Sequence, residues 1–426
     1  MKKNLIIFAI FTLVAAFLAS CGGQDSEMGA NGTEASGENA GGAPRPGEDT
    51  GTGEVMISER DEEILPSSEV INITSFDGYN LQGRITLPGG DRIDTLVIFA
   101  NATGPQTFDT RRNFERVGGG FANFNDFYAT RFQEQGIAFF AYNTRGVDIG
   151  GEFPLFRSID ETRFLTNLPA NQVRDIYYMI NALRTMDERL QNSQVILWGR
   201  TEGTIISTMF AELYPHMVDA LILISVYVDN MYDILWWHTT GGSEMIWYRY
   251  NFEADNYGRI SREAFEADPN NIIETALGGA YFELLDANND GFIDEDDFYI
   301  LWEMWRNELF RSIENRNNLR LGDLYNPRVT AQWFQEHFLL QSNMERITAL
   351  DLPIYIFHGT MDMSADVRRV EALRERLAEL NRTNVTINIL ENYDSELDVW
   401  RYIIYDEMPD GLQAAFDTVF NFNLLR

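Results

Sequence analysis

The chain has 426 residues, and 33 Lys and Arg against 65 Asp and Glu give it a formal net charge of −32. Binding to nucleic-acid phosphates needs clustered cationic side chains, so we expect no nucleic-acid partner. The single cysteine excludes an intramolecular disulfide and a multi-cysteine metal site. Lysine occurs only at Lys2 and Lys3, which excludes P-loop and Schiff-base chemistry from the body of the protein.

The N-terminus has the pattern of a secretory signal. Two lysines precede an apolar run over residues 5–18. Such a run is shorter than the about 20 residues that a membrane span needs. It ends in Leu18-Ala19-Ser20-Cys21, which resembles the lipobox of bacterial lipoproteins. The resemblance implies that residues 1–20 are removed as a signal peptide and that acylated Cys21 anchors the protein in the bacterial cell envelope. Gly22 in place of Asp implies the outer membrane, and an ordinary signal peptide with an incidental cysteine is the alternative.

Residues 21–63 are rich in Gly, Ser, Asn, Asp and Glu, and no aromatic residue occurs between Phe17 and Phe76. Such a segment cannot bury enough apolar surface to fold, so we predict a flexible acidic tether between the anchor and a folded body. The acidic body would be repelled by anionic headgroups and would stand off the membrane.

From residue 64 onward, strand-like and helix-like segments alternate. Short continuous apolar strands between helices indicate a mostly parallel sheet covered by helices on both faces, which is an α/β fold. The predicted strands span residues 68–74, 81–87, 95–100, 136–142, 194–198, 220–225, 353–357 and 385–390, and the predicted helices span residues 173–183, 205–213, 365–380 and 412–425.

The alternation stops between Ser225 and Pro353. A gap of that length exceeds an ordinary connection between elements, so it predicts an inserted domain. We therefore divide the body into a first core segment over residues 64–225, a helical insert over residues 226–345 and a second core segment over residues 346–426.

Several motifs in the core segments resemble those of the α/β hydrolase superfamily, in its serine-hydrolase branch of esterases and peptidases. Residues 102–105 (Ala-Thr-Gly-Pro) follow the third predicted strand, where that family places an oxyanion loop, and residues 142–146 resemble its YDxRG stretch. Gly199-Arg200-Thr201-Glu202-Gly203 occupies the nucleophile elbow, written G-x-S-x-G. Residues 358–362 resemble the loop that carries the acid of the catalytic triad. The order of these motifs implies an α/β-hydrolase fold with a doubly wound sheet and a helical cap.

The resemblance places the triad at Thr201, Asp362 and Ser395, and this set is degenerate. The β-branched Thr201 stands where the family has its Ser nucleophile, and its methyl group would crowd the path of attack. Ser395 stands in the slot of the family's His and cannot act as a general base. Loss of either the nucleophile or the base costs a triad enzyme about 10⁶ in rate. The resemblance also implies an oxyanion site at the backbone N–H groups near Thr103 and Glu202.

Four histidines are candidates to replace the missing base. His216 and His358 stand in segments that are structural in the family, whereas His238 and His337 belong to the insert, which could fold over the site. No spacing supports either of the latter two. We therefore expect a protein without conventional hydrolytic chemistry, and a hydrolase with an unconventional triad is the alternative.

Residues 286–297 of the insert (Asp-Ala-Asn-Asn-Asp-Gly-Phe-Ile-Asp-Glu-Asp-Asp) match the calcium-binding loop of an EF-hand. Gly291 and Ile293 occupy the glycine and apolar positions of the pattern. The last position is Asp, one methylene shorter than the preferred Glu, so we expect weaker calcium affinity or greater tolerance of magnesium. The predicted Ca²⁺ ligands are Asp286, Asn288, Asp290, the carbonyl of Phe292, Asp294 and Asp297.

EF-hand loops usually occur in pairs, and residues 253–264 keep the glycine and the isoleucine of the pattern at Gly258 and Ile260. Tyr257 and Ala264 replace two ligands, so we interpret this segment as a degenerate partner that packs without binding metal; an unrelated helix–loop segment is the alternative. We expect helices over residues 272–284 and 298–313 to flank the calcium loop. A permanently filled site would fix the shape of the insert.

Three functions fit the sequence. The first is a calcium-stabilised lipoprotein that binds a small molecule or a peptide in the former substrate cleft. The second is a hydrolase of ester, thioester or peptide bonds in which Thr201 attacks. The third is a structural surface protein, in which the aromatic side chains of the insert form a core.

Overall fold

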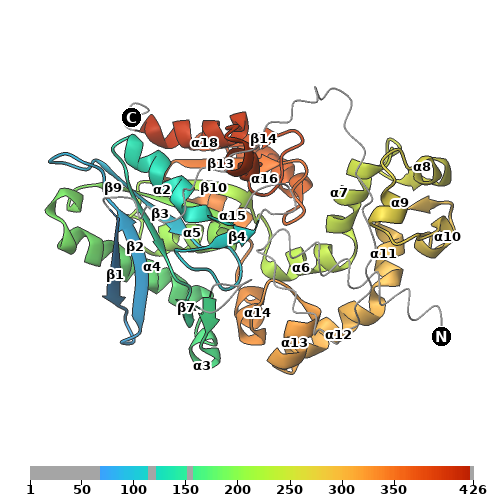
Figure 1. Cartoon of the computed structure of the whole chain (residues 1–426), viewed down its shortest axis with the longest axis horizontal. Coiled ribbons are helices and arrows are strands. Elements are labelled where there is room, and N and C mark those ends of the chain that lie inside the picture. Colours follow the sequence, from blue (N-terminus) through green and yellow to red (C-terminus); the bar gives the residue numbers. More distant parts are fainter. Residues whose placement is uncertain (1–67, 114–120, 151–156, 423–426) are drawn as a thin grey trace, which may run out of the picture.

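An eight-stranded sheet forms the centre of the protein (Figure 1). The computed structural model describes residues 68–113, 121–150 and 157–422. The strands lie in the order β1-β2-β6-β3-β9-β10-β13-β14. The pairs β1–β2 and β2–β6 are antiparallel, and every other neighbouring pair is parallel. The strands are β1 Ser68–Thr74, β2 Asn80–Thr86, β3 Thr95–Ala100, β6 Ala138–Tyr142, β9 Gln194–Thr201, β10 Ala220–Val226, β13 Ile354–Gly359 and β14 Val385–Leu390.

Helices bury both faces of this sheet, and the predicted α/β fold is confirmed. One apolar cluster packs the sheet against α4, α5 and α16, and a second packs it against α2 and α18. Central strands are buried on both faces, and every residue of β3 and β10 is buried. The helices are α2 Phe124–Glu134, α4 Pro169–Met186, α5 Glu202–Leu213, α16 Val367–Glu379 and α18 Asp410–Phe420.

The chain between β10 and β13 is mainly helical and reaches away from the sheet, on the right of Figure 1. Its outer part has a separate apolar core that includes Tyr248, Phe265, Phe282 and Phe298. The helices of this insert are α6 Met231–Thr239, α7 Gly242–Asn251, α8 Arg262–Ala267, α9 Ile272–Thr275, α10 Phe282–Leu285, α11 Glu295–Leu301, α12 Glu303–Glu314, α13 Asn318–Leu324, α14 Ala331–Phe338 and α15 Asn343–Ala349.

Two helix predictions in the insert are wrong. Residues 272–284 form the two short helices α9 and α10, because Gly278 and Gly279 between them have positive φ values of 59° and 74°. Residues 298–313 are shared between α11 and α12, which meet at Trp302. The apolar periodicity correctly predicted helical structure in both segments, but it did not indicate where one helix ends and the next begins.

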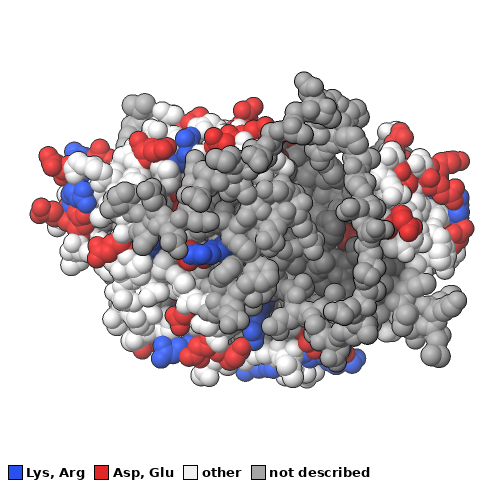
Figure 2. Space-filling view, in the orientation of Figure 1, with Lys and Arg blue, Asp and Glu red and all other residues white. Residues whose placement is uncertain are grey.

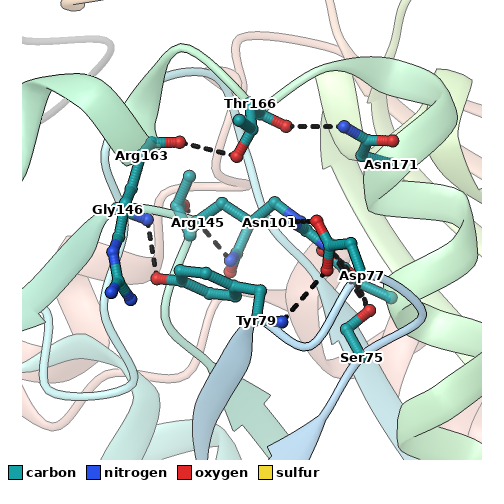
Figure 3. Close-up of polar contacts among 11 residues, drawn as sticks. Ser75, Asp77, Tyr79, Asn101, Arg145, Gly146, Arg163, Thr166 and Asn171 are labelled. Carbon is teal, nitrogen blue, oxygen red and sulfur yellow. Dashed lines mark hydrogen bonds and ion pairs between the residues drawn. The ribbon is translucent and has the colours of Figure 1, made fainter.

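Arg145, in the loop after β6, joins three parts of the core (Figure 3). Its guanidinium donates to both carboxylate oxygens of Asp175 in α4, at 2.6 and 2.7 Å, and to those of Asp77 in the β1–β2 turn, at 2.7 and 3.1 Å. This bidentate fork holds the pKa of Asp77 below its usual value. The arginine of the 142–146 motif therefore supports the loop that follows β6.

The predicted signal peptide (residues 1–20) and tether (residues 21–63, with Cys21) lie outside the described residues. Of the helices in the described ranges, none has both the length and the apolar character for crossing a bilayer. Carboxylates gather on the outer end of the insert over α8 and α10 (Figure 2), in keeping with the large negative charge of the chain.

Candidate active site

The sharp turn from β9 into α5 has the geometry of a nucleophile elbow. Thr201 adopts φ 49° and ψ −116°, a conformation that costs a β-branched residue strain energy. The flanking glycines are needed for close packing: a Cβ on Gly203 would lie 2.3 Å from the carbonyl oxygen of Ala100, and one on Gly199 would lie 2.5 Å from the carbonyl oxygen of Gly203. The elbow predicted from the G-x-T-x-G pattern is thus formed, with Thr201 at its tip.

The four histidines of the chain all lie within the described residues, and none of them makes a hydrogen bond with the Thr201 hydroxyl. Burial lowers the pKa of His238 to about 4, so its ring is neutral near pH 7. Their positions are the following: His238 lies 3.0 Å from the Ser364 carbonyl, His358 lies 3.2 Å from the Ala365 carbonyl, His337 lies 3.1 Å from the Glu202 carboxylate, and His216 is exposed.

Asp362 occupies the position expected of a triad acid, after β13. It is fully buried, and its Oδ1 accepts the backbone N–H groups of Ser364 at 2.8 Å and Ala365 at 3.2 Å. Its Oδ2 lies 3.6 Å from Nε2 of His358, and burial raises the pKa of the carboxyl group. The acid is therefore fixed in place, but the imidazole beside it belongs to His358 of β13 and lies 3.2 Å from the backbone carbonyl of Ala365.

The loop after β14 carries an ion pair where the family carries its histidine. Ser395 is buried, and no hydrogen bond joins its hydroxyl to Thr201 or Asp362 in the described structure. The next residue, Glu396, forms an ion pair with Arg200 of the elbow, and both side chains are less than one-tenth exposed. The guanidinium also lies over the ring of Phe124, 5.3 Å from its centroid. Sequence reasoning missed this pair, because the two residues are far apart in the chain.

Glu202, predicted only for its backbone N–H, has a side chain at the centre of a second buried network. Its Oε1 accepts hydrogen bonds from Nε2 of Gln172 at 2.7 Å and Nε1 of Trp333 at 2.7 Å, and it lies 3.1 Å from Nε2 of His337. Trp333 and His337 come from α14, so the insert is fastened to the residue after Thr201. Thr103, the other predicted oxyanion residue, is buried in the loop after β3.

The predicted calcium loop is closed by its own side chains. Asp286 accepts the N–H groups of Asp290 at 3.0 Å and Gly291 at 3.2 Å, and Asp297 accepts those of Ala287 at 2.7 Å and Asp294 at 2.8 Å. The other predicted side-chain ligands also accept backbone N–H groups of the loop, through Oδ1 of Asn288, Asp290 and Asp294.

The predicted partner loop lies against this one. Strand β11 (Ile260–Ser261) pairs antiparallel with β12 (Phe292–Ile293), and Ile260 faces Ile293. In the described ranges, no three His, Cys, Asp or Glu side chains converge as a preformed metal site. The predicted donor set also uses an amide and a backbone carbonyl, and its all-oxygen chemistry fits a hard cation such as Ca²⁺.

Among the comparisons with known proteins, only the search of solved structures found similar chains. A scan against models of protein families and a search of curated proteins each found no match. The solved structures that are similar to this chain include an α/β hydrolase, GrgF, from Penicillium sp. sh18, at 16% identity and a TM-score of 0.42, covering 84% of this chain and 96% of that one.

Two further similar structures are an acylaminoacyl peptidase from Pyrococcus horikoshii, at 12% identity and a TM-score of 0.43, and an esterase from Exiguobacterium antarcticum, at 12% identity and a TM-score of 0.42. The chain spans 41% of the peptidase and 99% of the esterase, and each covers 83% of this chain. The strand order and the elbow geometry identify the fold, which is that of an α/β hydrolase.

Proposed function

We propose that this protein is a non-hydrolytic, ligand-binding lipoprotein with an α/β-hydrolase fold, anchored through Cys21 and stabilised by calcium in its insert. One observation carries the non-hydrolytic part. None of the four histidines makes a hydrogen bond with the Thr201 hydroxyl in the described structure, and the loop that should supply the base is joined to the elbow by the Glu396–Arg200 ion pair.

The electrostatics of the elbow support the same conclusion. Acyl transfer at Thr201 would develop negative charge beside the N–H of Glu202, and catalysis there requires donors and positive potential. The buried Glu202 carboxylate instead adds negative potential. Burial raises the pKa of the Tyr227 hydroxyl, and the smaller effects of Tyr325, Asp362 and Glu202 act in the same direction. An oxyanion would be disfavoured at this place.

Hydrolysis by an unconventional triad is the second candidate, and the fixed position of Asp362 favours it. A fluorophosphonate probe distinguishes the two, because it labels only an activated hydroxyl nucleophile. We expect no labelling of the wild type or of Thr201→Ala, and labelling of the triple variant Thr201→Ser, Ser395→His, Glu396→Ala, in which the last change frees the loop. Labelling of the wild type that disappears in Thr201→Ala would establish the hydrolase.

Calcium binding is proposed for residues 286–297. The all-oxygen donor set and the pairing of Ile260 with Ile293 support it, because the two isoleucines hold the same position of the two loops. Terbium luminescence should show a single saturable site that Asp286→Ala abolishes. Asp255→Ala, in the degenerate loop, is the matched control and should leave that site intact. Two equal sites, or none, would contradict the proposal.

The lipid anchor is proposed from the sequence pattern around Cys21. Cells fed a clickable fatty acid should label the wild-type protein and not Cys21→Ser. The variant should move from the membrane fraction to the soluble fraction, since acyl chains supply the membrane affinity. Unchanged labelling of Cys21→Ser would refute the anchor.

A further inference from the structure

A pocket of about 380 Å³ lies beside the elbow, between the start of the insert and the acid loop. Its walls come from the end of β10, from α6 and from the N-terminal turn of α16, and its volume is in the range of small-molecule sites. Val226 in its wall pairs with Thr201 in the sheet register. Tyr227 also lines the pocket, and its backbone N–H donates to Oγ1 of Thr204 in α5 at 3.1 Å. The pocket therefore lies at the same edge of the sheet as the elbow.

The lining combines apolar, aromatic and charged residues. Val226, Val228, Ile234 and Ala365 are its apolar members, and Trp237 is the aromatic residue that it takes from α6. The π-face of an indole attracts an organic cation and repels an anion.

Most charges of the pocket are already paired. Arg369 donates to both oxygens of Asp229, at 2.6 and 2.7 Å, and Asp366 pairs with Arg368 at 2.9 Å. Asp233 is the exception: within the described residues its carboxylate has no hydrogen bond or ion pair, and Arg369 attracts it only at longer range. The lining thus carries one uncompensated negative charge next to apolar and aromatic surface.

We propose that this pocket binds a small organic cation, with an ammonium group paired to Asp233 and an apolar body against Trp237 and Ile234. The ligand carries one positive charge, because Asp233 is the single carboxylate of the lining without a paired arginine. The rim position of Asp233 lets the ammonium keep part of its hydration while the apolar body enters the pocket. This inference rests on the proposed binding role and names its ligand class.

Calorimetric titration of the full chain with three molecules of equal shape tests the charge requirement. Phenethylammonium should bind at one saturable site, phenethyl alcohol should bind at least about tenfold more weakly, and phenylacetate should not bind. A free phenylalanyl peptide and its N-acetylated form distinguish the source: tighter binding of the free peptide than of phenethylammonium identifies a peptide amine, and weaker binding identifies a small amine.

Asp233→Asn should weaken phenethylammonium binding about tenfold or more, while Asp91→Asn, an equal charge change on an exposed loop after β2, should leave it unchanged. Equal affinity for the ammonium and the alcohol in the wild type would overturn the proposal without any variant, and so would an unchanged affinity in a folded Asp233→Asn protein. Ester hydrolysis that depends on Thr201 would refute the proposed non-hydrolytic function instead, so the two failures are distinguishable.

Discussion

Replacing Glu396 by Gln tests the ion pair that joins the elbow to the loop after β14. The substitution keeps the shape of the side chain and removes the carboxylate charge that the buried Arg200 guanidinium faces. The side chains of Arg200 and Glu396 are 5% and 9% exposed, so solvent compensates little of the loss. Removing one partner of such a buried pair costs about 3–5 kcal/mol. We expect urea unfolding to show a loss of this size for Glu396→Gln.

The control is Glu379→Gln, which breaks an exposed pair with Arg376 whose side chains are 66% and 51% exposed. That loss should be within about 1 kcal/mol. Adding Arg200→Met to Glu396→Gln removes the buried guanidinium as well and should restore most of the stability, because an apolar side chain replaces a buried ion at little cost. If Glu396→Gln costs no more than Glu379→Gln, the pair does not lock the loop and our explanation for the missing base is wrong.

Two further predictions concern the core and the insert. Arg145→Lys keeps the charge but loses the fork that binds Asp175 and Asp77, so thermal unfolding should show a loss of about 3 kcal/mol, and an unchanged melting temperature would contradict the structural role. His238 has its folded pKa lowered to about 4. The unfolded chain takes up this proton below about pH 6.5, so wild-type stability should fall by about 3 kcal/mol as pH decreases from about 6.5 to 4. In His238→Gln this part of the pH dependence should disappear, and a wild-type profile in the variant would refute the assignment.

The sheet and the elbow could be predicted because their signals are local. Residues 95–100 and 385–390 form strands with the predicted bounds, since continuous apolar runs between turns fit few other structures. The elbow could be predicted from Gly199 and Gly203. Because these residues have no side chain, β9, α5 and the end of β3 can pack closely against one another.

The networks around the elbow could not be predicted, because folding alone brings their members together. Arg200 meets Glu396, and Glu202 meets Trp333 and His337, across separations of more than a hundred residues. The family resemblance placed Ser395 in the slot of a histidine, but nothing in the sequence indicated that the neighbouring Glu396 would pair with Arg200. The glycine pair at 278–279 was a local signal for the break between α9 and α10, and helical periodicity concealed it.

The proposed non-hydrolytic function is best tested by the steady-state hydrolysis of an activated ester, compared between the wild type and Thr201→Ala. Both proteins should be assayed with calcium present, at equal concentration, against buffer. We expect the same slow rate for both, because no base activates the Thr201 hydroxyl and Glu202 opposes an oxyanion. A wild-type rate well above buffer that is lost in Thr201→Ala would contradict it and would show that Thr201 is a catalytic nucleophile.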